Sequence, residues 1–183
     1  MSLKYEIMQL ADQLIRASGY HSFSYADISK PLEVKNAAIH YHFATKADLG
    51  LAVINQTRNN FLIQIKEWGE LSPLEQLQAF VNLYMDISQN NLVCFMGALG
   101  PAYTSLPDTM KEALTQASDE IRAWVSSVLS KGKADGVFSF QNASQDQADV
   151  IITSLLASLI LNRVTGEAIV QSTSQLLNNN ILA

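Results

Sequence analysis

The spacing of apolar residues constrains the fold of this chain more than any other feature. Residues 7–18 carry apolar or small side chains at the i, i+3, i+4 and i+7 positions of a half-buried helix, and Gly19 ends it. The same period returns repeatedly between residues 74 and 177. Val137–Phe140 could form a short strand, but a single strand has nothing to pair with. We therefore predict an all-α protein with about nine helices.

The segment from Ser24 to Lys46 has the pattern of a helix-turn-helix unit. Ser24 is placed to cap a short helix over residues 25–30, with the Asp27 carboxylate three residues on. Pro31 ends that helix, and a second short helix is expected over Val34–Tyr41. Thr45 then caps a long helix that runs from Lys46 to about Trp68.

The second short helix has the composition of a surface that reads DNA. Its outward positions carry hydrogen-bonding groups and flat rings, and its alanines keep it slim enough for a major groove about 12 Å wide. These positions are Lys35, Asn36, Ala37, Ala38, His40 and Tyr41. Ala38 can contact a thymine methyl group, while Val34, Ile39 and Phe43 support the helix from behind. Lys46 adds a positive charge to a helix N-terminus that already favours an anion such as a phosphate.

Charge is divided unevenly along the chain. The first 50 residues carry five basic and five acidic side chains and all three histidines, so the whole net charge of −5 lies in the remaining residues. An acidic protein would ordinarily be a poor candidate for DNA binding. The N-terminal segment is neutral, however, so binding there would depend on a few well-placed donors and on doubling by dimerisation.

The same segment resembles a known family. Val34–Leu49, together with Ala17–Tyr20 and Ser24–Ile28, is similar to the DNA-binding signature of TetR-type transcriptional regulators. The resemblance implies a DNA-binding domain over residues 1–48 and a larger helical ligand-binding and dimerisation domain over 49–183. It also implies a recognition helix over residues 35–42 and backbone contacts at the start of the preceding helix. The residues themselves predict DNA contacts at Lys35, Asn36, Ala38, His40, Tyr41 and Lys46, and the resemblance implies further contacts at Ser24, Tyr25 and His42.

One part of the motif departs from the family pattern. The turn before the recognition helix usually carries small residues and a glycine, whereas here it reads Pro31-Leu32-Glu33. A glycine there normally accepts a positive φ, which would cost a glutamate roughly 1 kcal/mol or more. Either Glu33 accepts that conformation or the turn has another shape. A weakened or altered operator preference is the expected consequence.

The larger domain offers candidates for a ligand pocket and for a dimer interface. Residues 84–103 contain a single charged residue, Asp86, so we expect an apolar or amphipathic ligand. The candidate pocket residues are Tyr84, Met85, Cys94, Met96, Tyr103 and Trp124, although aromatic residues at helical spacing also suit an ordinary core. The helix at 147–164 is apolar on nearly all sides. With a last helix at 167–180 it could form half of a homodimer interface, or it could be the central core helix of the domain.

Several function classes find no support in the sequence. His40 and His42 would lie about 200° apart on a helix, so they cannot share a metal ion. The chain has one cysteine and lacks the common phosphate-loop, metalloprotease and serine-hydrolase motifs, so we predict no metal, no cofactor and no enzymatic activity. The longest apolar stretch, Val150–Leu161, is short of the roughly 20 residues that span a bilayer. With no signal-peptide pattern at the N-terminus, we expect a cytoplasmic protein.

These features predict a ligand-responsive transcriptional regulator. By resemblance, it is a homodimeric repressor that a small molecule releases from a palindromic double-stranded operator. The alternative is a helical small-molecule-binding protein whose DNA binding is weakened or lost, which Glu33 and the neutral N-terminal segment favour.

Overall fold

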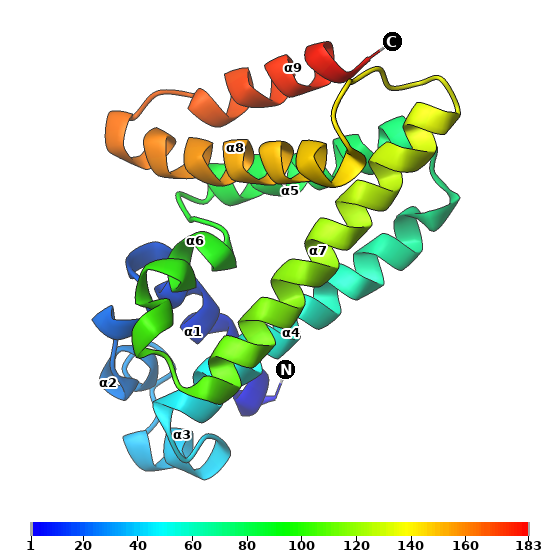
Figure 1. The fold of residues 1–183 in the computed structure, drawn as a ribbon. Coiled ribbons are helices and arrows are strands. Elements are labelled where there is room, and N and C mark those ends of the chain that lie inside the picture. The colour runs from blue at the N-terminus through cyan, green and yellow to red at the C-terminus, as the bar shows by residue number, and fades with distance from the viewer. Residues whose placement is uncertain (1, 183) are drawn as a thin grey trace. The chain divides into compact units, whose positions relative to one another are not determined.

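The computed structural model describes residues 2–182, which form nine α-helices and three short 3-10 helices (Figure 1). The all-α prediction is confirmed. The chain folds as two compact units. The first unit contains the chain up to Phe61 together with Phe95–Ala117, and the second contains Leu62–Cys94 and the chain from Ser118 onward. Helices α4 (Lys46–Glu67) and α7 (Asp108–Ala134) each contribute to both units.

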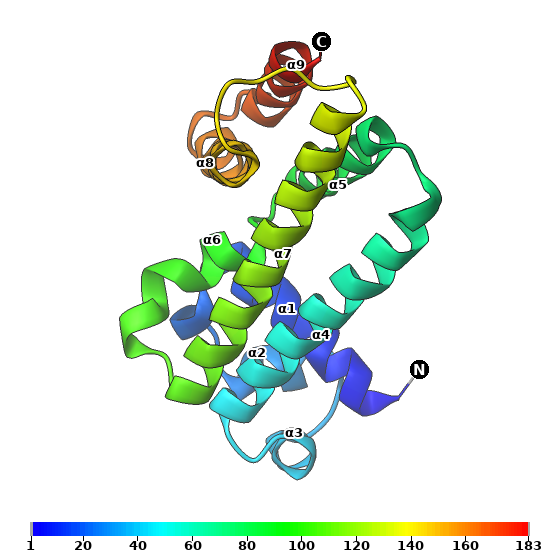
Figure 2. The same ribbon diagram turned by 45° about the vertical axis from the view of Figure 1, so that its right-hand side comes forward.

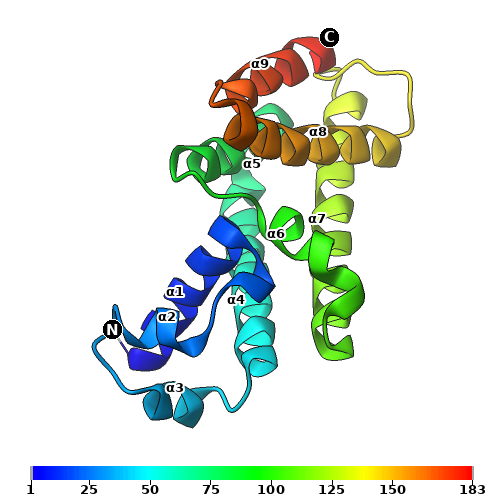
Figure 3. The same ribbon diagram turned by 90° about the vertical axis from the view of Figure 1, so that its left-hand side faces the viewer.

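The first unit is built around α1 (Leu3–Ser18). Its apolar face is fully buried, and Gly19 ends it with a φ of +94° that favours glycine over other residues. A 3-10 turn, Tyr20–Ser22, leads to α2 (Tyr25–Ser29) and α3 (Asn36–His42). These helices contact α1 and one another, as Figure 3 shows. The hydrophobic pattern that predicted α1 therefore describes its buried face.

The first unit also contains a segment that is distant in sequence. Helix α6 (Phe95–Leu99) packs against α1, and the 3-10 helix Gly100–Ser105 contacts α6 and leads into α7. The imidazole Nε2 of His21 lies 2.9 Å from the Ser105 hydroxyl. Gly50 of α4 sits where a Cβ would lie 2.6 Å from Met110 Cε and 2.9 Å from a ring carbon of Tyr20. The absence of a side chain at Gly50 thus allows α4, Tyr20 and Met110 to meet.

The second unit is a packed group of long helices. Helices α8 (Ser144–Thr165) and α9 (Ile169–Ile181) lie side by side, and both contact α5 (Pro73–Gln89) (Figure 1). Phe80, Leu129, Ile151 and Leu155 are almost fully buried in its core. The core of this unit is therefore assembled from α5, α7 and α8.

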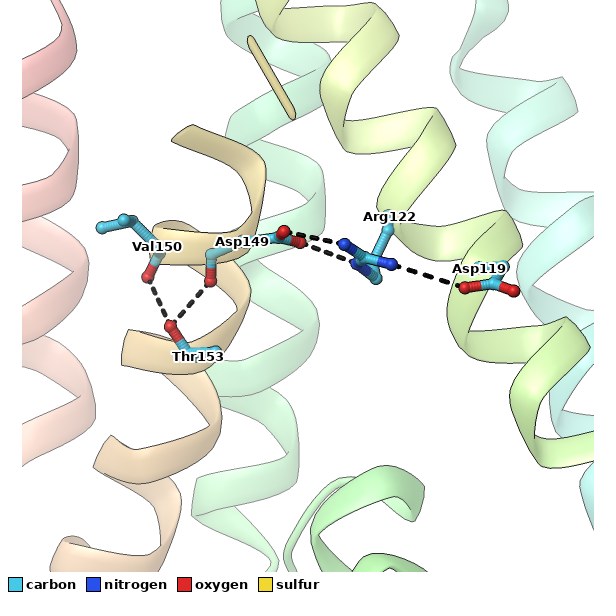
Figure 4. A network of polar contacts seen from close by, with 5 residues as sticks. All are labelled: Asp119, Arg122, Asp149, Val150 and Thr153. Carbon is cyan, nitrogen blue, oxygen red and sulfur yellow. Dashed lines mark hydrogen bonds and ion pairs between the residues drawn. The ribbon is translucent and has the colours of Figure 1, made fainter. Parts of the chain in front are cut away.

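A two-pronged ion pair joins α7 to α8 in the second unit. The Arg122 guanidinium donates to both carboxylate oxygens of Asp149, at 2.7 and 2.8 Å, and more distantly to Asp119 at 3.5 Å (Figure 4). On the next turn of α8, the Thr153 hydroxyl donates to the backbone carbonyls of Asp149 and Val150. The paired bonds lower the pKa of the Asp149 carboxyl and raise that of Arg122, so both groups stay charged.

Several boundaries differ from the sequence prediction. Val34 and Lys35 are not helical, because α3 begins at Asn36 with Lys35 at its N-cap position. Helix α8 begins at Ser144, three residues earlier than expected, and α9 begins at Ile169 instead of Glu167. The sequence interpretation also overlooked a capping box in which Ser72 and Glu75 exchange hydrogen bonds at the start of α5.

The segment Val137–Phe140 does have a partner. Phe138 forms an isolated antiparallel bridge with Leu182, and the Ser139 amide donates to the Ile181 carbonyl at 2.7 Å. The expectation that this segment has nothing to pair with is therefore wrong. The contact was not visible from the sequence because its two halves are more than 40 residues apart.

Helix α8 is long and apolar enough, by length and composition alone, to cross a membrane. Its inner face is nevertheless packed inside the second unit, where Ile151, Leu155 and Leu159 are buried. The apolar composition of the helix is thus partly explained by its place in the core.

Candidate nucleic-acid interface

Helix α2 begins with the capping arrangement that the sequence predicted. The Ser24 amide and hydroxyl donate to the Asp27 carboxylate at 2.7 and 2.8 Å. These bonds lower the pKa of Asp27, which therefore stays ionised at the start of the helix. Ser24 is exposed, so the first turn of α2 is accessible from outside the unit.

Helix α3 presents two chemically different faces. Ile39 and the following Phe43 are buried and hold the helix against the first unit. The opposite side is polar and aromatic, and it stands at the edge of the unit, where Figure 2 shows α3 beyond α2. Its exposed residues are Lys35, Asn36, His40 and Tyr41, with Ala38 and His42 half-buried. Tyr41 is 85% exposed.

The C-terminal end of α3 is fixed by contacts that the sequence did not reveal. The buried Tyr25 hydroxyl donates to the Phe43 carbonyl at 2.9 Å. Burial, with smaller effects of Asp48 and Tyr20, raises the pKa of Tyr25, so the hydroxyl keeps its proton. Tyr25 was predicted to contact DNA, but in this conformation its polar end is bonded inside the unit.

His40 is oriented by two neighbours. Its Nδ1 lies 3.1 Å from the Ala44 carbonyl, and its ring meets the edge of the Tyr25 ring at 4.7 Å between centroids. A carbonyl oxygen only accepts, so Nδ1 carries the hydrogen in this contact. Nε2 is then the ring nitrogen left for an external partner, and in the neutral form it is an acceptor.

Lys46 also points into the first unit. Thr45 caps α4 as predicted, through mutual bonds with Asp48 at 2.9 and 3.1 Å. The Lys46 ammonium donates to the Phe23 carbonyl and lies 4.0 Å from the centre of the Phe23 ring and 5.0 Å from that of Tyr20. Burial lowers the pKa of Lys46, and the nearby Asp27 carboxylate opposes this only in part.

The turn between α2 and α3 has the backbone shape that the family pattern implies. Glu33 adopts a φ of +54°, a left-handed conformation that glycine accepts more readily. The Val34 amide donates to the Ser29 carbonyl at 3.0 Å, which closes the turn. Of the two shapes considered for Pro31-Leu32-Glu33, the structure has the one with positive φ at Glu33.

The predicted pocket residues are divided between the two units. In the second unit, Phe80 contacts Tyr84 and Trp124, with ring centres 5.4 and 5.9 Å apart. Cys94 is buried and Met85 is half-buried in the same unit. Met96 and Tyr103 belong to the first unit, where the Tyr103 hydroxyl lies 3.1 Å from that of Thr115. Their role in ligand binding stays a prediction.

Helices α8 and α9 leave apolar side chains in solvent. The exposed residues of α8 recur with helical spacing on the side opposite its buried face. Val164 is 77% exposed, and Leu176 of α9 is 60% exposed. The apolar residues of these two helices with large exposure are Val150, Ile160, Leu161, Val164 and Leu176. Exposed apolar residues gathered on one face are typical of surfaces that bind other molecules.

No group of three or more histidine, cysteine, aspartate or glutamate side chains among residues 2–182 is arranged to hold a metal ion. The imidazole ring of His42 packs edge-on against the ring of Tyr41, with 5.2 Å between the two ring centres.

The comparisons with known proteins agree with this geometry. Residues 7–53, which include α2, α3 and the start of α4, match the sequence model of the family described as "Bacterial regulatory proteins, tetR family". The structure of a TetR-family transcriptional regulator from Agrobacterium tumefaciens superposes with a TM-score of 0.92 at 28% identity, covering 98% of this chain and 97% of that one. Residues 7–53 therefore carry the TetR-family sequence signature, and the chain has the fold of a TetR-family regulator.

Two transcriptional regulators are similar in sequence. The transcriptional regulator AcuR of Cereibacter sphaeroides is 31% identical over 102 residues, which cover 52% of this chain and 47% of AcuR. The HTH-type transcriptional regulator QacR of Staphylococcus aureus is 30% identical over 93 residues, covering 48% of this chain and 46% of QacR. The chain thus spans about half the length of the curated relatives it matches.

Proposed function

We propose that this protein is a TetR-family DNA-binding transcriptional regulator, and specifically a repressor that leaves a palindromic operator when a small molecule binds. The observation that carries the proposal is the exposed polar face of α3, which is held from behind by buried Ile39 and Phe43 within the part of the chain that matches the family. The family is one of regulatory proteins, and we assign the chain no catalytic role.

The proposal gives separate roles to the residues around α3. Asn36 and Lys35 offer hydrogen-bonding groups to base edges or phosphates at the first turn, and Ala38 offers an apolar surface to a thymine methyl group. His40 presents Nε2, because Nδ1 is engaged by the Ala44 carbonyl. Tyr41 and His42 follow on the same helix. Ser24, at the exposed N-terminus of α2, is suited to a backbone phosphate.

The dimer would form through the exposed apolar faces of α8 and α9, close to the predicted residues 147–164 and 167–180. Two copies of this surface would meet about a two-fold axis, so each side chain would be buried by the same surface of its partner. Dimerisation would double the number of DNA contacts. The N-terminal segment needs this because it has no net positive charge. The two recognition helices would then have to lie about 34–36 Å apart, so that they enter successive major grooves.

The effector is proposed to be an apolar or amphipathic small molecule. The support is the aromatic group of Phe80, Tyr84 and Trp124, together with residues 84–103, whose only charged side chain is Asp86. Release of DNA would follow if the effector binds more tightly to an arrangement in which the recognition helices no longer fit the operator. We propose that residues 1–48 act as the DNA-binding domain and 49–183 as the sensor and dimerisation domain, and that the protein works in the cytoplasm.

In vitro selection from a library of random DNA duplexes tests this proposal. The full-length protein should enrich a palindrome whose half-sites are about 10 base pairs apart from centre to centre. A matched selection with the Asn36→Ala, Tyr41→Ala variant should lose that enrichment, since both side chains are exposed and their removal does not disturb the core. If the wild-type protein enriches no common sequence even at low salt, the DNA-binding proposal fails.

A second candidate function is a helical small-molecule-binding protein with weakened DNA binding. It is favoured by the positive φ of Glu33 and by the inward direction of Lys46, which removes one positive charge from the outer surface. A thermal-shift screen against metabolites and drugs tests it together with the selection above. A protein that is stabilised by a compound but selects no DNA sequence would support this candidate over the first.

A further inference from the structure

Lys46 occupies a position that constrains α3 from one side. It is the first residue of α4, and only three residues separate it from the end of α3 at His42. Its ammonium donates to the backbone carbonyl of Phe23, which immediately precedes the N-cap of α2. The lysine therefore joins the start of α2 to the start of α4, and α3 lies between these two points in the chain.

The ammonium has three groups around it that are suited to a cation. Besides the Phe23 carbonyl, the rings of Phe23 and Tyr20 lie 4.0 and 5.0 Å from Nζ, within the range of cation–π attraction. A lysine that turned outward to a phosphate would lose all three contacts and leave the Phe23 carbonyl without this donor. Lys35, in contrast, is exposed at the N-cap of α3 and can reach a phosphate without such a loss.

The neighbouring contacts make the same region rigid. The ring of Tyr20 that faces Lys46 is confined on another side by Gly50, one turn further along α4, where Met110 of α7 also packs closely. At the C-terminal end of α3, the end nearest Lys46 in the chain, the Tyr25 hydroxyl donates to the Phe43 carbonyl. Two side chains, Lys46 and Tyr25, thus tie the start of α2 to the chain that follows α3.

We propose that Lys46 is a positioning residue, held by the Phe23 carbonyl and the rings of Phe23 and Tyr20, and that it sets the angle of α3 instead of binding a DNA phosphate. The positioning role concerns the first unit alone, whereas its consequence for operator affinity rests on the proposed function. The two parts are therefore tested separately, without and with DNA.

The first experiment uses the full-length protein without DNA. Lys46→Met removes the charge and keeps the apolar stem, and Phe23→Leu removes the ring beside it. Each variant should lower Tm by about 2–5 °C and speed amide hydrogen exchange in α3 by about fivefold or more. The decrease in Tm of the double variant should be smaller than the sum of the decreases in the two single variants, because both substitutions remove the same interaction. Lys35→Met is the matched control and should leave both measurements unchanged. Unchanged Tm and exchange in Lys46→Met would overturn the proposal.

The second experiment measures affinity for a selected duplex at several salt concentrations. Lys46→Met should weaken binding about tenfold, comparable to one lost base contact, while the slope of log K against log salt stays as in the wild type. A slope shallower by about 1.8, from about 0.9 for one lost phosphate contact in each protomer of the dimer, would overturn the proposal whatever the stability. If the wild-type protein binds no duplex, the proposed function fails, and the melting and exchange data alone decide whether Lys46 positions α3.

Discussion

Helices α3 and α8 bury one face each in the same manner, yet their outer faces are opposite in character. The inner face of α3 contributes Ile39 to a core, and that of α8 contributes Ile151 and Leu155. Outside, α3 carries His40 and the strongly exposed Tyr41, whereas α8 carries apolar residues such as Val164. The buried faces are explained by the fold of each unit. The outer faces are explained by the proposed partner of each helix. For α3 this is the major groove of DNA, and for α8 it is the same apolar surface of a second protomer.

The largest effect is expected from a charged substitution on the exposed apolar face of α8. Leu161→Asp on α8 would place two unpaired carboxylates in the proposed dimer interface, one from each protomer. The dissociation constant should rise about 100-fold or more, because a buried charge without a partner costs several kcal/mol. Sedimentation equilibrium at micromolar concentration should show a monomer. The control is Ile63→Asp, an exposed apolar residue of α4 away from that surface. A dimer that survives Leu161→Asp would place the interface elsewhere.

The inner faces of the two units differ in how tightly a glycine is packed. A Cβ at Gly132 would lie 2.1 Å from a ring carbon of the buried Phe138, while at Gly50 its nearest neighbour would be the flexible end of Met110 at 2.6 Å, with a Tyr20 ring carbon at 2.9 Å. Gly132→Ala should therefore destabilise the protein by about 2–3 kcal/mol and Gly50→Ala by less, since a methionine can move more easily than a ring. Urea unfolding measures both. Gly69→Ala, which meets nothing within 4 Å, is the control. Equal losses at Gly50 and Gly132 would contradict the proposed difference.

The ion pair between α7 and α8 should contribute a smaller amount. Both side chains are about 40% exposed, so solvent screening limits the loss in Arg122→Gln to about 1 kcal/mol or less at neutral pH. The pKa of Asp149 is lowered in the folded state, chiefly by its bonds to Arg122. The pair therefore stabilises the protein above the usual carboxylate pKa of about 4, and this is lost as pH falls through the lower folded value. The difference between wild type and variant should shrink below about pH 4, whereas a constant difference down to pH 2 would count against the pair.

The smallest effect compares two strained turns, one in each unit. Glu33 and Asn91 both have a φ of +54°. Asparagine tolerates this conformation better than glutamate, so Glu33→Gly should gain about 0.5 kcal/mol or more, and Asn91→Gly should gain less. Removing the Glu33 charge should also raise DNA affinity. Glu33→Gln separates the two causes, because it removes the charge and keeps the backbone strain. Thermal unfolding and DNA titration of the three variants provide the test, and a larger gain at Asn91 would refute this explanation.

Local features of the fold could be predicted from the sequence. The caps at Ser24 and Thr45 and the end of α1 at Gly19 depend on residues within a few positions of each other, and all three are present in the structure. The buried support of α3 by Ile39 and Phe43 also follows from a short repeat. Such features need no knowledge of what the rest of the chain does.

Contacts between distant segments could not be predicted in the same way. Lys46 at a helix N-terminus suggests an anion, and only the folded unit shows the Phe23 carbonyl and two rings around its ammonium. The Tyr25 hydroxyl and the Arg122–Asp149 pair are similar cases, since their partners lie 18 and 27 residues away. The bridge from Phe138 to Leu182 was missed for the same reason. These contacts decide which polar groups remain available for a partner.

Hydroxyl-radical footprinting of DNA upstream of the protein's own gene tests the central claim most directly. The wild-type protein should protect two half-sites related by a two-fold axis and separated by about one helical turn, and the protection should weaken steeply as salt rises from 50 to 200 mM. The Asn36→Ala, Tyr41→Ala variant should lose this protection while remaining folded and dimeric. Protection that is unchanged in this variant, or absent from any DNA that selection identifies for the wild type, would contradict the assignment of α3 as the reading helix.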